Sequence, residues 1–139
     1  MRLLVPVLLL LAAVSVQGFL KQSVAMKGIL NCRGNPLAST KVKLWDKNTF
    51  GKDEVLAENV TDSRGNFQLA GSTSSLFKMD VNFKVYHDCE DGIKPCQRKV
   101  SLPVPDAFVY RADVPERVFD AGNLNMAFRF PNEERSCIN

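Results

Sequence analysis

The sequence predicts an all-β protein, an antiparallel sandwich of two sheets with about seven strands, stapled by two disulfides. Three observations support this prediction. Short apolar runs alternate with polar residues at a period of two, and turn residues separate them at intervals of about 8–12 residues. No long stretch shows the helical period of about 3.6 residues. The chain has four cysteines, an even number, behind an N-terminal segment typical of secreted proteins, in which cysteines pair as disulfides.

The N-terminal segment has the three parts of a secretory signal peptide. Arg2 gives it a positive start, residues 3–14 are apolar with one proline, and residues 16–18 offer small side chains at a cleavage site. The apolar run is shorter than a membrane span. We therefore expect residues 1–18 to be removed and residues 19–139 to form one domain that is secreted to the extracellular space. An uncleaved anchor is the alternative.

Charge narrows the class of partner. Loss of Arg2 with the signal peptide would leave 17 basic and 15 acidic side chains, a net charge of +2. A nucleic-acid-binding domain needs a strong basic patch, so a balance this close to neutral argues against nucleic acid as the partner.

The series of predicted strands begins with residues 23–32, where apolar or small residues alternate with polar ones. Turn residues 33–36 end this strand. Residues 40–46 alternate again, with Val42 and Leu44 on the inner face. The single tryptophan, Trp45, thus falls on the solvent side, where it would cover a sheet edge, mark an interface or lie under a loop.

Residues 55–61 form the third predicted strand, with Leu56 and Val60 on one face. Asn59 has the opposite parity and begins an Asn-Val-Thr sequon. An N-linked glycan at Asn59 would therefore face solvent, as a glycan must. A chance sequon that carries no glycan is the alternative.

A turn of residues 62–66 leads to the next strand, which starts at Phe67. We expect Gly65 to occupy the position with positive φ in this hairpin. The chain then alternates over residues 79–87 and 98–104, and its last run lies within 119–130. The apolar positions of that last run are Leu124, Met126, Phe128 and Phe130.

The loop between the strands at 79–87 and 98–104 has the densest mixture of charges and two of the four cysteines. Loops held by a rigid sandwich are the usual place for recognition, so this loop is the candidate binding site. Arg98 and Lys99 could meet phosphate or carboxylate groups. The alternative is that the loop only staples the fold. The candidate residues are Tyr86, His87, Asp88, Glu90, Asp91, Lys94, Gln97, Arg98 and Lys99.

The chain lacks the set of side chains that an enzyme needs. His87, the only histidine, continues an apolar strand face, which favours a packed residue over a catalytic base. Nearby cations would neutralise the loop carboxylates, which favours a solvated loop over a calcium site. Zinc held by His87 and the two loop cysteines matches no paired cysteine spacing. We expect no catalysis, no metal and no cofactor.

With the strands placed, the chain resembles the nematode transthyretin-like family across nearly the whole mature sequence. The resemblance rests on residues 24–32, 42–46 and 61–69, and it is most specific at Tyr86-His87-Asp88-Cys89, at residues 94–99 and at Cys137. It implies a transthyretin-like two-sheet sandwich, secretion and no known catalysis. Some members are linked to recognition of cell surfaces, including exposed anionic lipid. The implied partner is thus an extracellular or cell-surface protein, or an anionic phospholipid.

The wider fold also includes a purine-pathway hydrolase and a thyroid-hormone carrier, and this chain departs from both. It has one histidine where the hydrolase site uses several, and it ends in Ser-Cys-Ile-Asn rather than Tyr-Arg-Gly-Ser. A second set of polar side chains, contributed by a neighbouring subunit, would be needed to complete a hydrolase site. A carrier of a small apolar ligand, in a cavity or at a subunit interface, remains the alternative function.

In a sandwich of this family, the strand ends that carry three of the cysteines should lie at one pole. We therefore expect Cys32 to bond one of the two loop cysteines, Cys89 or Cys96, and Cys137 to bond the other. The sequence does not decide which loop cysteine takes which partner.

Overall fold

The computed structural model describes residues 20–47 and 51–139. The predicted signal peptide, residues 1–18, lies outside the described residues. The strands and the one short 3-10 helix within the described part are β1 (Lys21–Cys32), β2 (Asn35–Pro36), β3 (Lys41–Asp46), β4 (Glu54–Val60), β5 (Asn66–Ser74), β6 (Val81–His87), β7 (Gln97–Pro103), η1 (Asp106–Phe108), β8 (Phe119–Asn125) and β9 (Glu134–Ser136).

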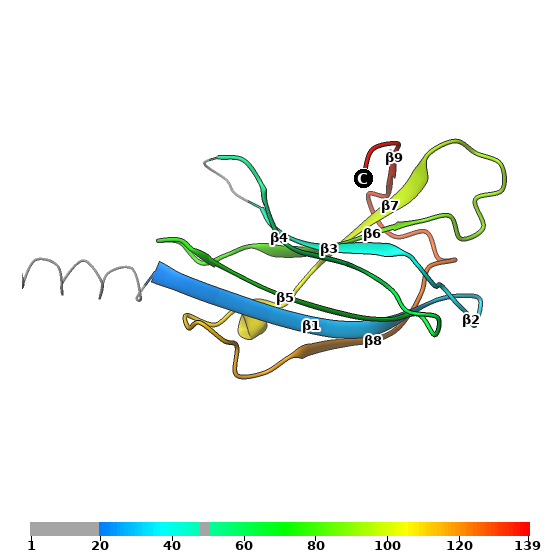
Figure 1. Cartoon of the computed structure of the whole chain (residues 1–139). Coiled ribbons are helices and arrows are strands. Elements are labelled where there is room, and N and C mark those ends of the chain that lie inside the picture. Colours follow the sequence, from blue (N-terminus) through cyan, green and yellow to red (C-terminus); the bar gives the residue numbers. More distant parts are fainter. Residues whose placement is uncertain (1–19, 48–50) are drawn as a thin grey trace, which may run out of the picture.

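These strands form two layers, as Figure 1 shows. The larger sheet has the order β4-β3-β6-β7-β9. In the smaller sheet β1 is central, with β5 on one side and β8 on the other, and β2 extends the hairpin at the end of β1. The predicted two-sheet sandwich is therefore confirmed.

One strand pair differs from the expected antiparallel arrangement. β8 runs parallel to β1. β7 belongs to the larger sheet and β8 to the smaller, so the chain crosses between the layers through residues 104–118. β8 thus reaches β1 from the other layer and not through a tight hairpin, which would force an antiparallel pair.

The core lies between the two layers and follows from the period-two pattern. The predicted inward residues of β1, β3, β6 and β7 are almost fully buried, except for Cys32 and Leu102, which are half-buried. Phe67 of the smaller sheet stacks on Phe83 of the larger one, with 4.9 Å between ring centroids. The core includes Val24, Met26, Leu30, Val42, Leu44, Phe67, Leu69, Val81, Phe83, Val85, Val100 and Met126.

For β4, the prediction of which side chains face inward was wrong. Opposite the step from Leu44 to Trp45, β4 contains one extra residue, so the pairing register shifts there. A β-bulge of this kind reverses which side chains face inward. As a result Val60 is 54% exposed. Asn59 lies opposite the inward residue Val42, yet remains exposed because β4 is the edge strand.

The last predicted strand was also too long. β8 ends at Asn125, whose side-chain oxygen accepts a hydrogen bond from the Ala127 backbone N–H at 3.0 Å and starts a turn. Phe128, an apolar position of the predicted run, therefore lies outside β8 and is 66% exposed. The chain after it forms the short strand β9 at the edge of the larger sheet.

Candidate functional site: the loop at the disulfide pole

The loop between β6 and β7 projects at one end of the sandwich, at the right of Figure 1. Two disulfides hold it, Cys32–Cys89 at its start and Cys96–Cys137 at its end. Each loop cysteine is therefore bonded to a distant segment rather than to the other, as predicted, and the structure decides the pairing. One bond ties the loop to β1, and the other ties it to the C-terminal tail.

Asp91 anchors the middle of the loop to the same tail. Its carboxylate is buried and accepts hydrogen bonds from both terminal nitrogens of Arg135, one of them at 2.8 Å. Arg135 also donates to the carbonyl oxygens of Pro95 and Cys96, at 3.3 and 3.2 Å. The hydrogen bonds from Arg135, with its positive charge, lower the pKa of Asp91 below its ordinary value.

Arg98 lies behind the loop and is 1% exposed. Its guanidinium donates to the carbonyl oxygens of Cys89 and Met126, both at 2.8 Å, and of Phe128 at 2.7 Å. Its remaining donors bind the carboxylate of Glu133. The prediction that Arg98 could meet a phosphate was wrong, because its donors all point into the protein.

His87 is the packed strand-end residue that its parity predicted. Its Nδ1 accepts a hydrogen bond from the Cys89 backbone N–H at 3.1 Å. Burial, assisted by the positive charge of Arg98, lowers the pKa of His87 to about 4. The imidazole is therefore neutral near pH 7, with its acceptor nitrogen already occupied.

The nine predicted contact residues separate into three groups. Tyr86, His87, Asp91 and Arg98 are buried, so they support the loop and do not contact a partner. Gln97 and Lys99 are half-buried, and Lys99 pairs with Glu134 at 3.4 Å. The exposed members of the predicted set are Asp88, Glu90 and Lys94.

Ile93, which was not among the predicted contact residues, is the most prominent side chain of the loop. It is fully exposed at the tip, between Gly92 and Lys94. Gly92 has a φ of 58°, and the Lys94 backbone N–H donates to the Asp91 carbonyl at 3.3 Å, which closes a tight turn. A lone apolar residue inside a polar loop was the signal in the sequence that could have identified it.

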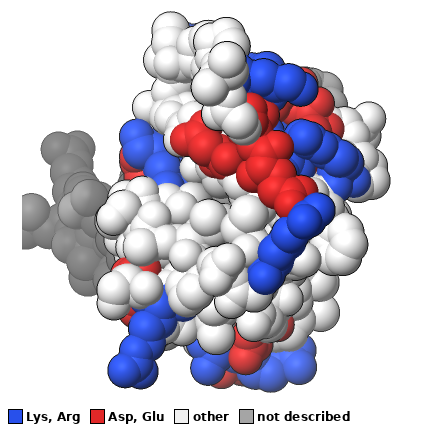
Figure 2. Space-filling model, turned by 90° about the vertical axis from the view of Figure 1, so that its right-hand side faces the viewer, with Lys and Arg blue, Asp and Glu red and all other residues white. Residues whose placement is uncertain are grey.

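Charge at this end of the molecule is mixed. Figure 2 shows a band of acidic side chains across it, with lysines and arginines on either side. Glu90 of the loop forms an ion pair with Arg33, which lies in the turn after β1. Since Arg98 is buried and Lys99 is paired, Lys94 is the main exposed cation of the loop itself.

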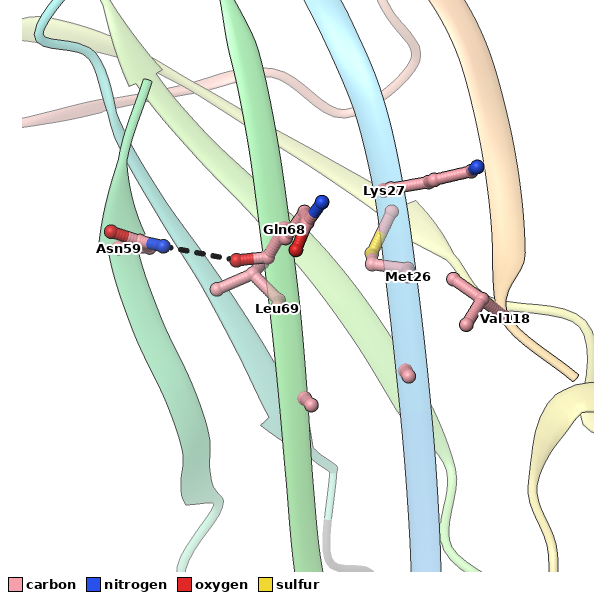
Figure 3. A pocket seen from close by; sticks show the side chains of 8 residues that line it. Met26, Lys27, Asn59, Gln68, Leu69 and Val118 are labelled. Atoms are coloured by element: carbon pink, nitrogen blue, oxygen red, sulfur yellow. Dashed lines mark hydrogen bonds between the residues drawn. The ribbon is translucent and has the colours of Figure 1, made fainter. Parts of the chain in front are cut away.

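The predicted glycosylation site borders a shallow groove along β1 and β5 (Figure 3). The Asn59 side-chain amide donates to the Gln68 carbonyl oxygen at 3.0 Å, which joins the edges of the two sheets. This bond uses one amide hydrogen, and a glycan would replace the other. Occupancy of the sequon by a glycan remains a prediction.

A cavity between the sheets bears on the carrier alternative. It has a volume of about 210 Å³ and apolar walls that include Met26, Phe83, Leu102, Phe119 and Leu124. Binding sites for small molecules typically measure about 300–1,000 Å³. The cavity is thus small for a carried ligand.

Residues 20–47 and 51–139 are the part of the chain that the structure describes. In this part of the chain, no group of three or more His, Cys, Asp or Glu side chains is arranged to hold a metal ion. The same residues contain no helix with the length and apolar character needed to cross a membrane.

Comparison with known proteins agrees with the resemblance seen in the sequence. The profile of the Transthyretin-like family matches residues 27–105. Transthyretin-like protein 33 of Caenorhabditis elegans is 43% identical over 132 residues, which cover 94% of this chain and 92% of that protein. Transthyretin-like protein 2 of the same organism is 40% identical over 124 residues, with coverages of 85% and 84%. Transthyretin-like protein 5 is 36% identical over 118 residues, with coverages of 84% and 85%.

Proposed function

We propose, on the premise that this chain belongs to the transthyretin-like family, that it is a secreted recognition module that binds a cell-surface protein and has no catalytic activity. The observation that carries the proposal is the rigid presentation of Ile93. The loop around it is fixed by two disulfides and by the hydrogen bonds of Asp91 with Arg135. A loop that is ordered before binding loses little conformational entropy when a partner binds.

The chemistry of the tip favours a protein as the partner. Ile93 offers an apolar anchor, and Lys94 beside it offers one cation to a carboxylate. A membrane attracts each basic residue by only about 1 kcal/mol, so a single exposed cation attaches weakly. The acidic band at this end lies between lysines and arginines, so the mixed charge adds little net attraction for anionic lipid. Anionic phospholipid is therefore the less favoured partner.

The absence of catalysis is proposed from the state of the one histidine. His87 is buried, its Nδ1 is occupied by the Cys89 N–H, and its pKa is lowered to about 4. A general base for reactions near neutral pH needs a pKa near the working pH and access to substrate. His87 meets neither requirement in the folded protein.

The test is a comparison of partner capture by matched variants of the mature protein. The double variant Ile93→Asp with Lys94→Glu should lose the partners that the wild type captures from cell surfaces. Val114→Asp is the control, because Val114 is also exposed but lies in the segment before β8. Circular dichroism confirms folding of each protein. Equal capture by the tip variant and the control would show that the contact surface lies elsewhere.

A second arm separates the two classes of partner. The same proteins are mixed with vesicles of phosphatidylserine and phosphatidylcholine, and with vesicles of phosphatidylcholine alone. We expect little binding of the wild type to either. Strong binding to the anionic vesicles that the tip variant loses would support lipid recognition in place of a protein partner.

A further inference from the structure

The outer face of the larger sheet carries a polar groove that is separate from the loop tip. Two segments rise from this face, residues 51–53 before β4 and the C-terminal segment that contains β9 (Figure 1). Between them lies a groove of about 590 Å³, lined by residues that include Trp45, Asp80, Asn82, Lys84, Ser101 and Glu134. Its size is within the range of about 300–1,000 Å³ that is typical of small-molecule sites.

The indole of Trp45 is held in place by two lysines. Lys84 Nζ lies 4.5 Å from the centroid of the Trp45 ring, and Lys43 Nζ lies 5.8 Å from it. Lys43 Nζ also lies 5.2 Å from the Tyr86 ring. Trp45 is half-buried and lines the groove, so it offers a fixed aromatic surface there.

The two lysines lie opposite each other in the sheet, which makes their contacts with the aromatic rings important for stability. Lys43 and Lys84 are direct partners across β3 and β6. Like charges placed opposite each other destabilise a sheet, and cation–π contacts with Trp45 and Tyr86 offset this repulsion. The rings and the two lysines therefore form one interdependent unit.

The charges around the groove balance. Asp53, Asp80 and Glu134 contribute three carboxylates, while Lys47, Lys84 and Lys99 contribute three ammonium groups. A charged ligand would be attracted by one set of these groups and repelled by the other, so the groove offers it little net electrostatic attraction. The amide of Asn82 and the hydroxyl of Ser101 both donate and accept hydrogen bonds. The groove thus suits a neutral ligand with many groups that can both donate and accept hydrogen bonds.

We infer that this groove binds a neutral carbohydrate, such as a short segment of an extracellular glycan. Each sugar hydroxyl donates and accepts, which matches the mixture of carboxylates, ammonium groups, amide and hydroxyl on the groove walls. The C–H face of a pyranose ring is apolar and packs on an aromatic ring such as Trp45. The inference concerns residues outside the loop tip, so it holds or fails independently of the proposed protein partner.

The test uses the fluorescence of Trp45, which is the only tryptophan of the chain. The mature protein is first applied to an array of neutral and sulfated oligosaccharides. The neutral oligosaccharide with the strongest signal is then titrated in solution. We expect a saturable change in tryptophan emission. Binding of sulfated oligosaccharides alone, or no saturable response to any neutral one, would overturn the inference.

Two variants test whether the oligosaccharide binds on this face. Ser101→Tyr places a large side chain in the groove and should weaken binding at least about tenfold, since it takes up volume that the ligand would occupy. Ser72→Tyr is the matched control, because Ser72 is an exposed residue of β5 on the other sheet. It should bind as the wild type does. Equal affinity of the Ser101→Tyr variant and the wild type would show that the groove is not the site.

Discussion

The guanidinium of Arg98 joins three parts of the chain that are distant in sequence. Its hydrogen bonds reach the start of the loop at Cys89, the turn after β8 at Met126 and Phe128, and the carboxylate of Glu133. Although burial opposes ionisation of Glu133, the hydrogen bonds and charge of Arg98 lower the pKa of that carboxyl. The pair therefore acts as the internal support of the disulfide pole.

Arg98→Ala is expected to reduce the free energy of unfolding by about 3–5 kcal/mol. It removes the shortest ion pair of the half-buried Glu133 carboxylate, which keeps only the longer contact with Arg129, and it leaves three carbonyl oxygens without their donor. Urea denaturation measures this change. Lys99→Ala is the control at the neighbouring position, where a partly exposed ion pair with Glu134 contributes about 0–1 kcal/mol. Similar losses of unfolding free energy for the two variants would mean that Arg98 does not stabilise the disulfide pole more than an exposed ion pair does.

His87 gives stability a dependence on pH. Its pKa is about 4 in the folded protein, against an ordinary value of about 6.5 in the unfolded chain. Between these values the unfolded chain binds the proton more readily, so stability is full above pH 6.5 and falls as the pH drops towards 4. We expect a loss of about 3 kcal/mol from this group.

The measurement is chemical denaturation at several pH values, for the wild type and for His87→Asn. The asparagine carbonyl oxygen can accept the Cys89 N–H bond but does not titrate in this range. The pH dependence of the variant should be shallower between pH 4 and 6.5. Asp91 and Glu133, whose pKa values are lowered, lose their stabilisation at lower pH in both proteins. Parallel curves would rule out His87 as the source.

At the scale of single elements, the turn between β4 and β5 depends on one glycine. Gly65 has a φ of 82°, as predicted, and its backbone carbonyl accepts the Leu30 N–H at 2.9 Å. A side chain at this position would place its Cβ 2.2 Å from the Leu30 carbonyl oxygen. The turn is therefore closed against β1 and does not tolerate a larger residue.

Gly65→Val is expected to lower the free energy of unfolding by roughly 1–3 kcal/mol through backbone strain, with the contact against Leu30 adding to this. Gly34→Val is the matched control. Gly34 also has a positive φ, but an added Cβ there meets no atom within 4 Å. Its variant should lose less stability in urea. A Gly65 variant as stable as the wild type would contradict the turn geometry.

The same scale shows which features the sequence could predict. β1, β3 and β6 show a period of two that depends only on local residues, and their inward faces were predicted correctly. The parity of β4 was wrong, since its bulge depends on the register with β3. β2 and β9 have two and three residues, too few to show a period.

The candidate site was predictable to a similar degree. The strand ends of a sandwich of this family predicted that each loop cysteine bonds a distant cysteine, but the sequence did not decide which one. The burial of Arg98 did not, because it depends on Glu133, which is 35 residues away and gives no local signal. Cations in a polar loop are usually solvated, and only the folded arrangement shows which one is taken inside.

At the scale of the whole molecule, the two disulfides have different consequences. Cys32–Cys89 links β1 to the loop and thus spans the two sheets, with a sequence separation of 57 residues. Cys96–Cys137 has a separation of 41 residues and holds only the tail against the loop. In the chain-entropy account each contributes about 4 kcal/mol. Removal of either disulfide should affect the loop differently, because of the two bonds only Cys96–Cys137 holds the tail that brings Arg135 close to Asp91.

The double variant Cys96→Ser with Cys137→Ser should fold but expose the loop amides. Hydrogen exchange measures this directly, and we expect faster exchange over residues 88–96 while β1, β3 and β6 remain protected. Partner capture through Ile93 should fall with it, since the loop then loses entropy on binding. The control is Ile138→Ser, which changes an exposed residue of the same tail and leaves the disulfide intact. If exchange in the loop is unchanged without the bond, then Asp91 and Arg135 alone keep the tip rigid, and capture should be retained.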